Sequence, residues 1–114
     1  MNKHRRLHWL AAPAVAALMA AAATAGAADS QMTLGTQLFI QTAVPACALC
    51  HTLKDAATTG SVGPDLDDLK PDAARVAAAL RNGIGSMPSF KDSLSEEQIL
   101  AVARYVAGAS GAAK

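Results

Sequence analysis

The sequence predicts an all-α fold of three main helices joined by loops, and three observations support this prediction. Apolar residues make up 52% of the 114 residues but aromatic residues only 4%. Much of the apolar fraction is alanine, which favours helix and buries little area. Apolar residues recur at helical spacing in the second half of the chain, and no strand pair, internal repeat or second domain is apparent.

Residues 1–28 have the organisation of a secretory signal peptide. Three of the first six residues are basic, and residues 10–23 form an almost unbroken apolar run that ends in small residues. This pattern predicts cleavage after Ala27 or Ala28 and export to the periplasm. An uncleaved membrane anchor is the alternative, because the run approaches the ~20 residues of a spanning helix. Its alanine richness makes it weakly hydrophobic, so we expect no membrane span in the mature form.

The mature domain, residues 29–114, is small and slightly acidic. It keeps seven of the ten basic residues and all nine acidic ones, so its net charge is −2, whereas that of the whole chain is +1. The domain has no basic stripe, which argues against nucleic-acid binding. A domain of 86 residues buries little surface and typically needs a disulfide, a metal or a large cofactor.

The first half of the mature domain contains one predicted helix and a long loop. The helix covers residues 33–42 and ends before Pro45, because residues before proline avoid the α region. Residues 46–53 are predicted as a second, short helix. Residues 58–71 contain two glycines and two prolines, which predicts a loop.

Two further helices are predicted from their end signals. One begins at Pro71, a favourable first helical position, and ends at Gly83, a C-cap residue. The other has Ser95 as its N-cap, with Gln98 completing a capping box, and it ends at Gly108.

The two cysteines lie in one Cys-x-x-Cys-His run at residues 47–51. This run is typical of covalent haem attachment, in which Cys47 and Cys50 form thioethers and His51 binds the iron. A thioredoxin-like pair would need a βαβ unit, and a disulfide across three residues would stabilise little. Zinc needs four ligands, but His51 is the only histidine of residues 29–114. We therefore expect one haem c, which would also supply the core volume that the few aromatic residues do not.

A second axial ligand could come from Met32 or Met87, the two methionines of residues 29–114. Met32 lies near the start of the first predicted helix, where a core or surface role is expected. Met87 lies in a glycine-rich loop that is able to bend close to the haem. The loop favours Met87, and a His/Met pair is a known haem ligand set.

Residues 32–109 resemble class I cytochromes c, particularly the small bacterial electron carriers. The resemblance rests on four segments in the family's order: Gly35 with Phe39, Gly63-Pro64-Asp65-Leu66, Met87-Pro88-Ser89-Phe90, and residues 94–106. It implies the cytochrome c fold around one covalent haem. It also implies that Met87 is the second axial ligand and that the Pro64 carbonyl accepts a hydrogen bond from His51. Four further residues are expected either on the haem or in the general core: Leu66, Leu69, Phe90 and Tyr105.

The expected function is one-electron transfer in the periplasm between a dehydrogenase donor and an oxidase or other acceptor, without enzymatic activity of its own. Four basic residues are expected to surround the exposed haem edge: Lys54, Lys70, Arg81 and Lys91. One alternative is a tightly bound cytochrome subunit of an oxidoreductase, because the Gly-Pro-Asp-Leu and Met-Pro-Ser-Phe segments look like those of carriers paired with sulfite-oxidising enzymes. A gas-binding or peroxidase-type haem protein is the other alternative.

Overall fold

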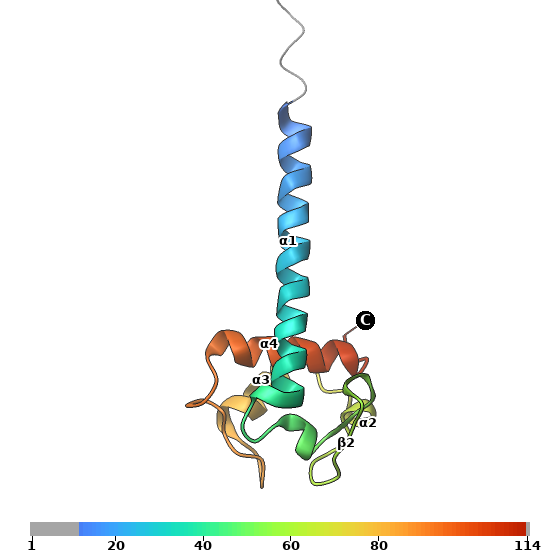
Figure 1. Ribbon diagram of the computed structural model, residues 1–114, viewed down its shortest axis with the longest axis vertical. Helices are drawn as coiled ribbons and strands as arrows, with labels where there is room; N and C mark the ends of the chain where they lie inside the picture. The colour runs from blue at the N-terminus through green and yellow to red at the C-terminus, as the bar shows by residue number, and fades with distance from the viewer. Residues whose placement is uncertain (1–11, 114) are drawn as a thin grey trace, which may run out of the picture. The chain divides into compact units, whose positions relative to one another are not determined.

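The computed structural model describes residues 12–113 (Figure 1). Side chains are described from residue 22 onward. Residues 1–11 of the predicted signal peptide lie outside the described part of the chain. The chain divides after Ser30 into two compact units. Within residues 12–113, no helix combines the length and the apolar character that crossing a bilayer requires.

The first helix is longer than predicted, because α1 covers Ala12–Gln37 rather than beginning at residue 33. Alanine, the best helix former, is frequent along α1, and Pro13 stands in the first turn, where its missing N–H costs nothing. From Leu38 to Thr42 the chain continues as a π-helical turn, η1, which ends at the predicted residue.

The structure between residues 46 and 59 differs from the predicted helix of residues 46–53. A 3-10 turn, η2, covers only Cys47–Leu49, and β1 (Thr52–Leu53) then pairs antiparallel with β2 (Thr58–Thr59) around the 3-10 turn η3 (Lys54–Ala56). The strand pair was not expected. Thr58 explains it, because its hydroxyl donates to the His51 carbonyl (2.9 Å) and accepts from the Leu53 N–H (3.1 Å). Such side-chain bonds to the backbone compete with helix formation.

The predicted loop of residues 58–71 contains, besides β2, one helical turn. This turn, α2, covers Leu66–Leu69, and the Asp65 side chain caps it by accepting from the N–H groups of Asp67 and Asp68. α3 covers Ala73–Asn82 and so begins two residues after the predicted Pro71, because Asp72 is its N-cap. Gly83 follows α3 and has a φ of +68°, a conformation that glycine adopts readily at the end of a helix.

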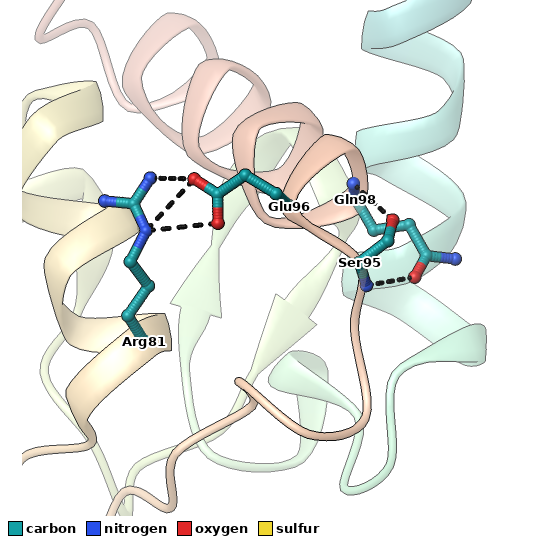
Figure 2. A network of polar contacts seen from close by, with 4 residues as sticks. All are labelled: Arg81, Ser95, Glu96 and Gln98. Atoms are coloured by element: carbon teal, nitrogen blue, oxygen red, sulfur yellow. Dashed lines mark hydrogen bonds and ion pairs between the residues drawn. The ribbon is translucent and has the colours of Figure 1, made fainter.

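The last helix, α4, covers Glu96–Ala109 and confirms the predicted capping box. The Gln98 N–H donates to Ser95 Oγ (3.1 Å), and the Ser95 N–H donates to Gln98 Oε1 (2.9 Å), as Figure 2 shows. The helix passes Gly108 by one residue. α4 packs against α3, and its buried residues form the centre of the core.

Tyr105 connects α4 to two other segments of the core. Its ring meets that of Phe39 edge to face, with the ring centres 5.8 Å apart, and its hydroxyl donates to Asp55 Oδ2 at 2.7 Å. Burial, followed by the bond to Asp55, raises the pKa of the Tyr105 hydroxyl, so this hydroxyl remains a donor. Gly35 of α1 lies so close to α4 that a Cβ there would lie 2.7 Å from Tyr105 Cβ.

We expect Gly35→Ala to lower the free energy of unfolding by about 1–3 kcal/mol, the usual cost of overpacking a core. The added methyl group would also meet the Ala101 carbonyl oxygen, which as backbone cannot turn aside. Denaturant titration followed by circular dichroism measures the change. Gly108→Ala is the matched control, because a Cβ there would meet only Met32 Cε at 3.5 Å. The control should be as stable as the wild type or more stable by about 0.5–1 kcal/mol, and equal losses in both variants would contradict the close contact at Gly35.

Candidate haem site

A cavity of about 590 Å³ lies within the unit that begins at Gln31. Its wall is mainly apolar and comes from four parts of the chain: η1 and residues 45–51, residues 62–71, α3 with residues 82–90, and α4. Several core side chains also belong to this wall, including Phe39, Leu80, Phe90, Val102 and Val106. The cavity is therefore continuous with the hydrophobic core.

Cys47, Cys50 and His51 all line this cavity. The turn η2 brings them together, because the N–H groups of Cys50 and His51 both donate to the Cys47 carbonyl, at 3.1 and 3.0 Å. The two cysteines form no disulfide. Burial raises the pKa of the Cys47 thiol to about 11, so this thiol is protonated at neutral pH.

The His51 ring is held by the segment that follows β2. Its Nδ1 lies 2.7 Å from the Pro64 carbonyl oxygen, which accepts only, so in the neutral ring Nδ1 carries the proton and Nε2 has its lone pair free. The Gly63 N–H donates to the Cys50 carbonyl at 2.7 Å, which keeps this segment against the motif. The arrangement matches that of a metal-binding histidine, whose second nitrogen usually donates to a carbonyl or carboxylate.

Glycine at position 63 makes this close approach possible. A Cβ there would lie 2.5 Å from His51 Cε1 and 2.9 Å from Nδ1. Gly60 plays a similar part, since its Cβ would lie 2.6 Å from the His51 backbone nitrogen. Both glycines allow the backbone of residues 60–64 to pass directly beside the motif.

Met87 lies on another part of the same wall, in the segment that follows α3. It is half-buried and packs against the hydrophobic core. Ile84 and Met87 exchange two backbone hydrogen bonds of 3.0 Å each, so a tight turn presents Met87. Met32, the other methionine considered from the sequence, does not line the cavity and is 38% exposed.

Comparisons with known proteins agree with the motif and the cavity. The family described as cytochrome c oxidase, cbb3-type, subunit III matches residues 30–106. The chain belongs to this family of c-type cytochromes. The crystal structure of the c-type cytochrome SorU from Sinorhizobium meliloti is similar, with 51% sequence identity and a TM-score of 0.70 over 73% of this chain and 94% of that one. No curated protein matches.

As a c-type cytochrome, the protein is an electron-transfer protein that carries covalent haem c, and its cavity fits this group. Two thiols with the spacing of the attachment motif, a histidine with a free Nε2 and an apolar wall are all present. All seven site residues named from the sequence line the cavity: Cys47, Cys50, His51, Pro64, Leu66, Met87 and Phe90. Their contacts with the haem stay predictions.

Leu69 and Tyr105, which were expected either on the haem or in the core, differ in their surroundings. Leu69 lines the cavity, but Tyr105 does not, because its ring and hydroxyl are directed to Phe39 and Asp55. None of the four basic residues expected around the haem edge lines the cavity, and one of them, Arg81, is paired with Glu96 (Figure 2).

The cavity wall also contains residues that were not identified from the sequence, among them Val62, Arg75 and Ile84. Val62 and Ile84 are 73% and 70% exposed although they line an apolar cavity. Each directly precedes a glycine, two and three residues from Pro64 and Met87 respectively. An aliphatic side chain in such a polar, glycine-rich segment was the available signal.

We expect Gly63→Ala to displace the His51 ring from its place beside Pro64, because the added methyl group would overlap Cε1. The visible spectrum of the purified haem protein should then lose part of its low-spin character, and resonance Raman spectra should report a weakened iron–histidine bond. Ser61→Ala is the matched control, since Ser61 is exposed on the same segment. Wild-type spectra for Gly63→Ala would refute the close approach.

Proposed function

We propose that this cytochrome is a one-electron carrier of the bacterial periplasm, with His51 and Met87 as the axial ligands of its haem. The observation that supports this most directly is that His51 and Met87 line one mainly apolar cavity. When bound, haem c supplies an iron that changes between the ferrous and ferric states. Two protein ligands leave no iron position for a substrate, which favours electron transfer over catalysis.

The histidine side of this ligand set is supported by the bond to Pro64. The Pro64 carbonyl keeps the proton on Nδ1 and prevents rotation of the ring, so Nε2 stays available in one orientation. Attachment through Cys47 and Cys50, on the turn that also positions His51, would fix the same geometry covalently.

The methionine side is supported by elimination and by burial. Apart from His51, residues 29–114 contain no histidine, and only Met87 of the two methionines lines the cavity. A thioether is a soft ligand that favours ferrous iron, and a His/Met pair raises the reduction potential. The apolar wall also raises the reduction potential, because it favours ferrous iron, which carries less charge than ferric iron.

The exposed residues of the wall indicate where a redox partner could approach. Val62 and Ile84 line the cavity and nevertheless expose most of their side chains. The cavity therefore reaches the surface beside these two aliphatic side chains. We propose that donor and acceptor proteins meet the cytochrome here.

We expect Met87→Ala to keep the covalent haem but to change the ferric spectrum from low spin to high spin. Removal of the thioether opens one iron position, so the reduced variant should bind carbon monoxide, which the wild type should not. Met32→Ala is the matched control and should behave as the wild type. Carbon monoxide binding by the reduced wild type would instead support the gas-binding or peroxidase-type alternative.

We expect the native protein to elute alone, at the size of a monohaem cytochrome, when a periplasmic extract is fractionated by size exclusion. Its amino terminus should be Ala28 or Asp29, which Edman sequencing or mass spectrometry can determine. Co-elution of the haem with a large subunit would contradict the free carrier and support the subunit of an oxidoreductase, such as a sulfite dehydrogenase. Recovery in the membrane fraction with residues 1–28 attached would contradict export as a processed protein.

A further inference from the structure

The segment that presents Met87 is fixed to the end of α3 by backbone hydrogen bonds. After the turn in which Ile84 and Met87 bond each other, the Phe90 N–H donates to the Leu80 carbonyl at 2.7 Å. Phe90 is buried in the core, whereas the residues between it and the turn are exposed. The exposed part therefore needs a second attachment to keep one conformation.

Ser89 supplies this attachment through its side chain. Its hydroxyl donates to the Arg81 carbonyl at 2.6 Å and accepts from the Lys91 N–H at 3.2 Å. The Arg81 carbonyl belongs to the last turn of α3, where carbonyl groups have no partner within the helix. Ser89 thus joins the helix end to the segment two residues after Met87.

The anchor on α3 is itself held in place. The Arg81 guanidinium is paired with the carboxylate of Glu96 at the start of α4, as Figure 2 shows. The residue whose carbonyl receives the Ser89 hydroxyl is therefore connected to both helices of the core.

Gly83, which directly follows α3, adds a steric limit to the same segment. A Cβ at this position would lie 2.9 Å from both the Met87 carbonyl oxygen and the Ser89 nitrogen. The backbone of residues 87–89 is thus packed directly on Gly83 and has little room to move toward α3. Movement away from α3 remains, and the Ser89 hydroxyl opposes it.

We propose that Ser89 is a positioning residue for Met87: its hydrogen bond to the Arg81 carbonyl keeps the Met87 segment closed over the cavity. The inference rests on the proposed function, in which the Met87 sulfur binds the haem iron. An external ligand can replace that sulfur only when the segment moves outward. Loss of the Ser89 hydroxyl should therefore ease this replacement without changing the ligand itself.

Imidazole titration of the ferric haem protein, followed in the visible spectrum, tests the proposal. We expect Ser89→Ala to lower the apparent dissociation constant of imidazole about fivefold, the factor that corresponds to one net hydrogen bond. Before imidazole is added, the variant should still show the weak red charge-transfer band of a methionine–iron(III) bond. Ser86→Ala is the matched control on the same turn, because Ser86 is exposed and its hydroxyl makes no hydrogen bond within residues 12–113.

Ser89→Thr and Ser89→Val separate the hydroxyl from the shape of the side chain, and they also serve if the alanine variant does not fold. The threonine variant should keep the wild-type affinity for imidazole, and the valine variant should bind it about fivefold more tightly. Equal affinities in these two variants, or an equal change in Ser86→Ala, would overturn the positioning role. If the wild type lacks the methionine–iron band, the proposed ligation fails, whereas a wild type with the band and an unchanged Ser89→Ala variant would refute only this inference.

Discussion

The hydrogen bond between His51 Nδ1 and the Pro64 carbonyl is the interaction on which the arrangement of the site depends. It connects the motif to a segment thirteen residues away, and it determines which ring nitrogen is free. Two glycines, Gly60 and Gly63, give that segment the space to lie against the motif. Without them the carbonyl could not approach the ring, and Nε2 would have no fixed direction. The backbone of an irregular loop thus does what a second-sphere side chain does in many metal sites.

The two sides of the cavity are built by separate parts of the chain and by different means. The histidine side depends on a 3-10 turn, a short strand pair and the Thr58 hydroxyl, all within residues 47–64. The methionine side depends on the end of α3 and on the turn at residues 84–87. Each side is closed by its own local hydrogen bonds, so a change on one side need not alter the other. This separation is what allows Met87, the proposed ligand, to be studied by substitution.

The sequence was most informative where one local signal decides the structure. The capping box at Ser95 and the attachment motif involve residues only three apart, and both were read correctly. Predictions failed where a side chain bonds to the backbone of a segment without regular apolar spacing: Thr58 converts the end of the expected helix into a strand, and Asp65 caps a turn inside the expected loop. Tyr105 was expected near the haem or in the core. Its long-range bond to Asp55, which the sequence does not reveal, places it in the core. The positions of Val62 and Ile84 in the cavity wall depend on loop conformation, which cannot be predicted from the spacing of apolar residues.

The scarcity of aromatic residues and the presence of the cavity have the same cause: the core of this domain is built to include a haem. Phe39, Leu80, Val102 and Val106 belong to the core and to the cavity wall at once, so a bound haem extends the core rather than occupying a separate pocket. Filling an apolar volume of about 590 Å³ is worth on the order of 10 kcal/mol on the scale of cavity-forming substitutions. A domain of this size has a total stability of about 5–15 kcal/mol. This gross contribution of a bound haem is comparable in size to that net stability, and covalent attachment through two cysteines would keep the haem in place.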